Sequence, residues 1–228
     1  RNEGDGLVDA VQEAIEIGRL SGASVQIAHH KACGRPNWGK VKTTLAMIRE
    51  SREVGMDLSV DQYPYIAGAT SLGALLPAWV HEGGTEAAVE RIEARRDELL
   101  DYFRNKGKAG GLLADDGGWS SVVISGVHTE RNRHLEGLTL EQLAQERGTQ
   151  PPEAVLDLLV EEKLSASMVQ FSQCEEDIMA VMRSDAAMFG TDASARSTSG
   201  PLSKGKPPPR AFGAFPRVLG RYVREQKV

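Results

Sequence analysis

The chain has 228 residues, of which 40% are hydrophobic and 26% are charged, and its formal net charge is −5. These values are typical of a globular protein with one sizeable core, and the 27 Lys and Arg residues are interspersed among 32 Asp and Glu residues, which argues against a nucleic-acid-binding surface. No apolar run approaches the roughly 20 residues of a membrane-spanning helix. The chain opens with neither an initiating Met nor a signal peptide, and Cys33 and Cys174 have neither metal-type spacing nor a disulfide framework. We therefore expect a cytoplasmic protein, without membrane or nucleic-acid partners, whose sequence begins inside a longer chain.

Apolar periodicity and turn residues predict an alternation of strands and helices. In chain order, the expected elements are a helix from Leu7 that ends by Gly22, a strand at 25–28, a helix through Val41, Leu45 and Ile48, a strand at 56–60, a charged helix at 85–105, a strand at 122–124, helices opened by Thr139 and by Pro152, a strand at 168–171, a helix at 175–183, a strand at 187–190 and a last helix at 212–224.

This βα alternation, with short and continuously apolar strands, predicts parallel strands covered by helices. Polar residues gather directly after these strands, which is where an α/β barrel carries its active site. They are His29, His30, Lys31, Asp61, Tyr63 and Asp192. About five strands are expected, fewer than the eight of a closed barrel, so the pattern predicts part of a barrel.

Two strand-end residues are candidates for metal and proton chemistry. A histidine such as His29, held by a strand, can present a neutral imidazole nitrogen to a metal, although a polar strand cap is the commoner use. Asp192 can take a proton from a metal-bound water and later protonate a leaving amine, and a helix N-cap or Asx-turn is an equal alternative.

Two further residues are candidates for substrate contacts. Tyr63 can donate a hydrogen bond to a developing oxyanion, whereas buried aromatic packing is the commoner role of a tyrosine at this place. Arg210 follows three prolines that stiffen its loop and can bind a carboxylate through two nitrogens; the alternative is an exposed arginine in a proline-rich connection.

Several segments resemble one family in the same order along the chain. They are residues 29–40 (HHKACGRPNWGK), 61–65 (DQYPY) with 67–70 (AGAT), 189–192 (FGTD), 209–220 (PRAFGAFPRVLG) and, at the start, 1–5 (RNEGD). Together they are similar to strand five and the segments that follow it in N-acyl-D-amino-acid deacylases, the D-aminoacylases of the amidohydrolase superfamily.

The resemblance implies a zinc-dependent enzyme that hydrolyses N-acyl-D-amino acids, which are small-molecule substrates, to a carboxylate and a free D-amino acid. It implies that His29 is the strand-five zinc ligand and Asp192 the carboxylate that moves a proton between zinc-bound water and the departing amine. Arg210 would bind the α-carboxylate of the substrate, with Lys31 and Tyr63 as weaker candidates. His30 and Asp61 complete the candidate site.

The resemblance also implies a fold, namely one incomplete TIM-type (β/α)8 barrel domain over residues 1–228, holding about strands five to eight and their covering helices, with a helical insertion around 75–118. The His-x-His metal pair of the superfamily and the cysteine ligand of this family would lie upstream of Arg1. Strand six ends in Asp61-Gln62-Tyr63, where the superfamily usually has a histidine, and Pro208 stands where a histidine is expected. We therefore expect weak zinc binding by the isolated chain.

Two other functions stay open. A cyclic-amide hydrolase of the same superfamily would share His29 and Asp192 but would have less need of Arg210. A truncated barrel without catalytic activity would act as an assembly module, because exposed strand edges pair with other chains. Two copies, or a separately encoded N-terminal half, would then complete the barrel.

Overall fold

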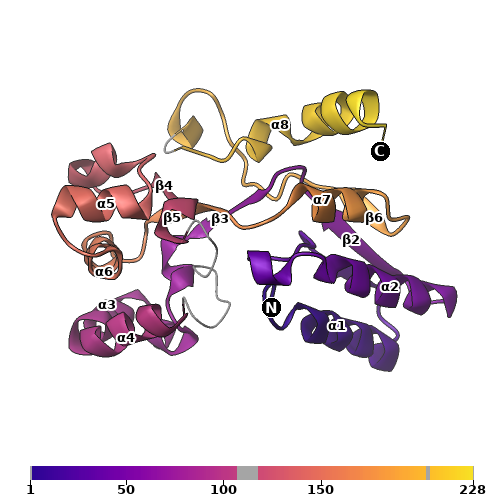
Figure 1. Cartoon of the computed structure of the whole chain (residues 1–228), viewed down its shortest axis with the longest axis horizontal. Coiled ribbons are helices and arrows are strands. Elements are labelled where there is room, and N and C mark those ends of the chain that lie inside the picture. Colours follow the sequence, from indigo (N-terminus) through magenta and orange to yellow (C-terminus); the bar gives the residue numbers. More distant parts are fainter. Residues whose placement is uncertain (1, 107–117, 204–205, 228) are drawn as a thin grey trace. The chain divides into compact units, whose positions relative to one another are not determined.

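The computed structural model describes residues 2–106, 118–203 and 206–227, which divide into two compact units. Unit 1 is made of Arg1–Ile66, Ser172–Arg196 and Pro209–Val228, and unit 2 is made of Ala67–Phe171 and Ser197–Pro208. Each unit contains one three-stranded sheet, and the elements of both are labelled in Figure 1. The expectation of a single incomplete barrel domain stays a prediction.

The sheet of unit 1 is parallel and has the order β1-β2-β6. Its strands are β1 (Val25–Ile27), β2 (Leu58–Gln62) and β6 (Ala187–Phe189). The strands expected at 25–28, 56–60 and 187–190 are therefore confirmed, with boundaries shifted by up to two residues. The central strand, β2, buries alternate side chains, which include Leu58 and Val60.

Helices pack against this sheet as the apolar periodicity predicts. They are α1 (Leu7–Ser21), α2 (Lys40–Glu53), α7 (Glu175–Met182) and α8 (Arg210–Arg217), the last continued by a π-helix (Val218–Glu225). The buried residues that join the first three helices to the sheet are Leu7, Val11, Ile15, Val41, Ile48, Leu58, Val60 and Val181. Neighbouring helices are in contact in the order α1, α2, α7 (Figure 1). Gly18 permits the close approach of α1 to β1, because a Cβ there would lie 2.6 Å from Val25 Cγ2.

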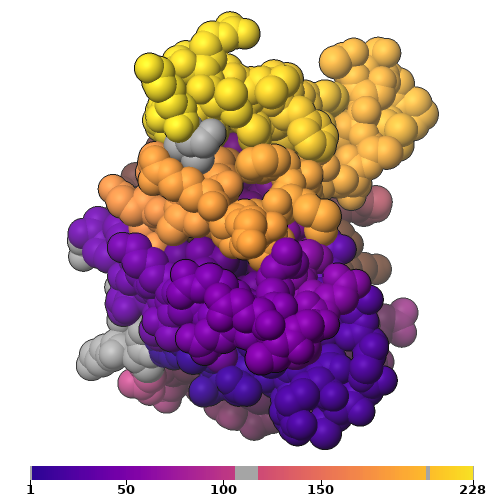
Figure 2. Space-filling model, turned by 90° about the vertical axis from the view of Figure 1, so that its right-hand side faces the viewer, coloured from indigo at the N-terminus to yellow at the C-terminus, as the bar shows by residue number. Residues whose placement is uncertain are grey.

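The C-terminal helices cover α7. Val218 and Tyr222 pack against Ile178 and Met182 of that helix, and Figure 2 shows the C-terminal segment lying on the segment that contains α7. The Tyr222 hydroxyl donates a hydrogen bond of 2.7 Å to Glu175 at the start of α7. The last helix expected from the sequence is thus confirmed, and it begins two residues earlier, at Arg210.

Unit 2 has an antiparallel sheet in the order β3-β5-β4. Its strands are β3 (Ala67–Ser71), β4 (Val122–Gly126) and β5 (Ser167–Phe171). Its α-helices are α3 (Thr85–Ala94), α4 (Arg96–Lys106), α5 (Leu140–Arg147) and α6 (Pro151–Glu161). A large apolar core joins this sheet to the helices.

The expectation that the strands at 122–124 and 168–171 belong to the parallel set is wrong. Both are part of the antiparallel sheet of unit 2, in which Val169 pairs with Val123 on one side and with Ala69 on the other. The strand β3 was not expected, because Ala, Gly and Thr side chains give no apolar alternation. Its backbone pairing with β5, rather than its side chains, holds it in the sheet.

The charged helix expected at 85–105 is two helices, which separate at Arg95. The φ and ψ angles of Arg95 are −119° and 34°, and its guanidinium stacks on the ring of Trp79 at 4.0 Å. These helices lie within the insertion expected around 75–118, of which residues 107–117 lie outside the described part of the chain. Among the described residues, no helix combines the length and apolar character needed to cross a membrane.

A buried carboxylate closes the end of α6 in unit 2. Glu162 is 2% exposed and accepts hydrogen bonds from the backbone N–H groups of His128 (2.5 Å) and Thr129 (3.0 Å), from the Thr129 hydroxyl and from Asn132 Nδ2 (2.6 Å). Burial acts to raise the pKa of Glu162, but these hydrogen bonds outweigh it and lower the pKa below its usual value.

We predict that Glu162→Gln lowers the free energy of unfolding by about 2 kcal/mol at pH 7, because the amide cannot accept all of these hydrogen bonds. The folded-state pKa lies below that of the unfolded chain, so the stabilisation is present above a pH of about 4.3 and is lost as the pH falls through the folded-state pKa. Urea unfolding at several pH values measures this. The exposed Glu93 supplies the control substitution Glu93→Gln. A difference between Glu162→Gln and the unchanged protein that does not shrink at low pH contradicts the prediction.

Candidate active site

The carboxyl ends of β1, β2 and β6 lie at the same edge of the sheet of unit 1, because all three strands are parallel. His29 follows β1, Tyr63 follows β2 and Asp192 follows β6. Since β2 is the central strand, the residues after β1 and β6 flank its end. The predicted site residues are therefore brought to one edge.

A tight turn presents His29. Its φ angle is 42°, in the left-handed region that few side chains adopt. Its backbone N–H donates to Asp61 Oδ1 at 2.7 Å, and the N–H of His30 donates to the Asp61 carbonyl at 2.8 Å. Gln26 Nε2 holds the second carboxylate oxygen of Asp61 at 2.7 Å. Asp61 thus shapes the turn that presents His29.

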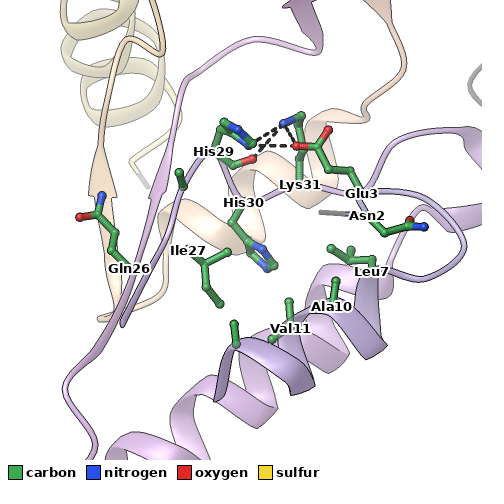
Figure 3. Close-up of a pocket in the computed structure, with 12 residues that line it drawn as sticks. Asn2, Glu3, Leu7, Ala10, Val11, Gln26, Ile27, His29, His30 and Lys31 are labelled. Atoms are coloured by element: carbon green, nitrogen blue, oxygen red, sulfur yellow. Dashed lines mark hydrogen bonds and ion pairs between the residues drawn. The ribbon is translucent and has the colours of Figure 1, made fainter. Parts of the chain in front are cut away.

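The imidazole of His29 is held by Glu3 and Lys31 (Figure 3). Nδ1 lies 2.9 Å from Glu3 Oε1 and 2.9 Å from Lys31 Nζ, and Lys31 Nζ also donates to Glu3 Oε1. Burial acts to raise the pKa of Glu3, but the hydrogen bond from His29 and the charge of Lys31 outweigh it and lower the pKa to about 2. The Glu3 carboxylate is therefore ionised at neutral pH.

This contact determines which nitrogen of His29 is available to a ligand. The hydrogen bond to Glu3 is the main cause that raises the pKa of His29, and the charge of Asp192 adds to it. When Nδ1–H donates to Glu3, the lone pair of Nε2 is free, and a carboxylate behind the imidazole is the arrangement that orients metal-binding histidines. Among the described residues, no group of three or more His, Cys, Asp or Glu side chains could hold a metal ion. His29 therefore fits the place of one metal ligand, and the described residues do not form a complete metal site.

His30 has a structural role in this arrangement. Its side chain is buried, and its Nε2 lies 2.8 Å from the hydroxyl of Thr44 on α2. The Thr44 hydroxyl donates to the carbonyl of Val41 at 3.0 Å, so it accepts a hydrogen bond from the imidazole. Burial lowers the pKa of His30 to about 4, which keeps the ring neutral at pH 7.

Asp192 and Arg210 form the second half of the site. Asp192 has a φ of 43°, and the Arg210 guanidinium holds the turn through Nε to the carbonyls of Thr191 (3.1 Å) and Asp192 (2.8 Å). Arg210 Nη2 donates to the Asp192 carbonyl at 2.7 Å and to its Oδ2 at 2.8 Å. Arg210 is 3% exposed, and its Nη1 has no hydrogen-bond partner among the described residues. The α-carboxylate contact expected of Arg210 stays a prediction, and Nη1 is the nitrogen left for it.

Tyr63 lies in the interior, 1% exposed, and its hydroxyl accepts a hydrogen bond of 2.9 Å from Gln173 Nε2. Its ring faces the guanidinium of Arg210 and the ammonium of Lys31. The oxyanion contact expected of Tyr63 and the substrate contact expected of Lys31 stay predictions. Lys31 is 8% exposed, and its amine is already engaged by Glu3 and His29.

A cavity of about 300 Å³ lies between α1 and β1, beside His29 (Figure 3). It is lined by Asn2, Glu3, Leu7, Ala10, Val11, Ala14, Gln26, Ile27, Ala28, His29, His30 and Lys31. Among the described residues, β1 pairs only with β2, so the cavity borders a free strand edge.

Glu3 and Gln173 were not found from the sequence. Glu3 lies within residues 1–5, a segment that resembles the family, but an acidic residue in a short loop carries no signal of its own. Gln173 precedes α7 and contacts Tyr63 across 110 positions of sequence. Only the folded chain brings that pair together.

Comparisons with known proteins agree with this geometry. No protein-family model matches the chain. It is 28% identical over 228 residues to N-acyl-D-glutamate deacylase of Alcaligenes xylosoxydans xylosoxydans, covering 100% of this chain and 36% of that protein. The chain therefore spans about a third of the length of this relative.

Solved structures give the same result. The crystal structure of N-acyl-D-glutamate deacylase from Bordetella bronchiseptica, complexed with zinc and a phosphonate inhibitor that mimics the tetrahedral intermediate, matches with a TM-score of 0.70 at 27% identity, over 100% of this chain and 37% of that one. A D-aminoacylase that defines a subset of amidohydrolases matches with a TM-score of 0.69 at 29% identity, over 100% of this chain and 36% of that one. The resemblance inferred from the motifs is confirmed: the chain is homologous, from end to end, to a region of the N-acyl-D-amino-acid deacylases.

Proposed function

We propose that this chain carries the strand-end part of the active site of a zinc-dependent enzyme that hydrolyses N-acyl-D-amino acids. The observation that supports the proposal is the position of His29 and Asp192 after the two strands that flank β2, at one edge of one parallel sheet. The charge of Asp192 acts on the imidazole of His29, which requires that the two groups lie near each other.

Each side chain has a role in this proposal. His29 would hold the zinc ion through Nε2, oriented by Glu3 behind it. Zinc, when bound, lowers the pKa of its water to about 7 and polarises the amide carbonyl. Asp192 would accept a proton on Oδ1, which has no contact among the described residues, and would pass it to the departing amine. Arg210 would bind the α-carboxylate of the substrate through Nη1.

We further propose that the parallel sheet is part of a TIM-type barrel, completed by the N-terminal part of the protein, by a separately encoded half or by a second copy. The free edge of β1 and the cavity beside it support this proposal, because a parallel strand paired there would bury apolar side chains of α1 and β1. Cys33 and Cys174 are free and buried, which accords with the reducing cytoplasm that we propose for the protein.

We predict that Asp192→Asn in the complete enzyme lowers kcat by about 10²- to 10⁴-fold, the usual contribution of general acid–base catalysis. The substitution leaves the backbone carbonyls that Arg210 contacts in place. Asp185, an exposed residue before β6 and hence at the other end of that strand, supplies the control Asp185→Asn. Steady-state hydrolysis of N-acetyl-D-amino acids measures the effect. Full activity in Asp192→Asn, or an equal loss in both variants, argues against the proposed role.

Substitution of Arg210 separates the deacylase from a cyclic-amide hydrolase. We predict that Arg210→Lys in the complete enzyme raises KM for N-acyl-D-amino acids at least about tenfold, because an ammonium cannot replace the planar guanidinium. It also lowers kcat, since three of the guanidinium contacts hold the turn at Asp192. Assays with N-acyl-D-amino acids and with their α-amides measure this. A loss that is the same for acids and amides shows that Arg210 does not bind the carboxylate.

We predict that the isolated 228-residue chain retains less than one zinc ion per molecule after dialysis, because it offers a single well-placed histidine. Elemental analysis measures the zinc, with His29→Ala expected to remove the residue that is bound. His134→Ala is the control, since His134 lies in unit 2 against Glu146. Tight stoichiometric binding by the isolated chain contradicts the prediction. Zinc that is absent even from the complete protein favours the assembly module without catalytic activity.

A further inference from the structure

Two cations lie against a single aromatic ring at the edge of the sheet. The guanidinium carbon of Arg210 is 4.5 Å from the centroid of the Tyr63 ring, and Lys31 Nζ is 5.7 Å from it. Both distances are within the range of attraction between a cation and a ring face, and this attraction is strongest where water is excluded. Here the ring is 1% exposed and neither cation is more than 8% exposed.

Each of the two cations holds one of the groups that the proposed function requires. Lys31 contacts Glu3 and the Nδ1 atom of His29, so its position fixes the carboxylate that orients the imidazole. Arg210 contacts the backbone carbonyl and Oδ2 of Asp192, so its position fixes the carboxylate on the other side. The ring of Tyr63 is thus a shared support for both halves of the site.

The ring is itself fixed from below. Gln173 Nε2 donates to the Tyr63 hydroxyl at 2.9 Å, and the Gln173 backbone N–H donates to the carbonyl of Ile66 at 3.1 Å. Burial raises the pKa of Tyr63 far above its usual value, so the phenol stays neutral and places no anion between the two cations. The hydroxyl faces Gln173 in the interior, and the ring face remains for the cations.

We infer that Tyr63 is a positioning residue whose ring holds Arg210 and Lys31, and through them sets the orientation of Asp192 and His29. The catalytic meaning of this inference rests on the proposed function, whereas the geometry can be tested without any activity. The ring, not the hydroxyl, carries the effect, so Tyr63→Phe preserves it. Tyr63→Leu and Tyr63→Met remove it, and the methionine fills the space with a flexible apolar side chain.

Nuclear magnetic resonance of the isotope-labelled chain tests the inference. In the unchanged chain we expect nuclear Overhauser contacts from the Tyr63 ring protons to the δ protons of Arg210 and to the ε protons of Lys31. We expect the Arg210 Nε–H to exchange slowly with water, because it is buried and bonded to two carbonyls. Exchange should become at least about tenfold faster in Tyr63→Leu and Tyr63→Met, and should change less than about twofold in Tyr63→Phe.

Tyr65 supplies a matched control. Its ring lies 4.8 Å from the guanidinium carbon of Arg217, so Tyr65→Leu removes the same kind of contact two residues away. It should leave exchange at Arg210 unchanged, with circular dichroism used to confirm that each variant is folded.

Several results would overturn the inference. One is the absence of ring contacts to either cation in the unchanged chain, which needs no variant to fold. The others are slow Arg210 exchange in a folded Tyr63→Leu or Tyr63→Met chain, and a Tyr63→Phe chain that behaves like the leucine variant. If the contacts are found but Asp192→Asn keeps full activity in the complete enzyme, the proposed function fails and the geometry stands. In an active enzyme, kcat should fall in Tyr63→Leu and recover in Tyr63→Phe.

Discussion

The parallel pairing of β1 and β6 with β2 is the constraint on which the candidate site depends. It directs three strand ends to one edge of the sheet and separates His29 from Asp192 by only the end of the central strand. The buried contacts of α1, α2 and α7 with this sheet fix the pairing. A change that reversed one strand would move its polar residues to the opposite edge, and the candidate site would be lost although every residue remained.

The two carboxylates at this edge have different surroundings, which match different tasks. Glu3 is held by Lys31 and His29, and its lowered pKa keeps it charged as a fixed support for the imidazole. Arg210 engages only Oδ2 of Asp192, and Oδ1 has no contact in the described part of the chain. A carboxylate that moves a proton needs such an accessible oxygen in a fixed position. The left-handed turns at His29 and Asp192 are both stabilised by side chains, Asp61 for the first and Arg210 for the second.

The local sequence was sufficient to predict the parallel strands, because each is a short apolar run that ends in polar residues. It could not assign β4 and β5 to a second sheet, since an apolar strand looks the same whether its neighbours are parallel or antiparallel. It could not reveal β3, whose Ala, Gly and Thr residues are held by backbone pairing. In the site, it identified His29, Asp192 and Arg210 as candidates. The partners that orient them, Glu3 and Gln173, are distant in sequence and have no pattern of their own.

The central claim is that His29 and Asp192 face one shared space at the edge of the sheet, so that both can act at one metal centre. The most direct test is a crystal structure of the complete protein with zinc, in which anomalous scattering locates the ion. The account predicts an anomalous peak at Nε2 of His29, with the Asp192 carboxylate beside it and Glu3 bonded to Nδ1. A zinc ion bound away from His29, or an Asp192 carboxylate that faces a different cavity, would contradict it.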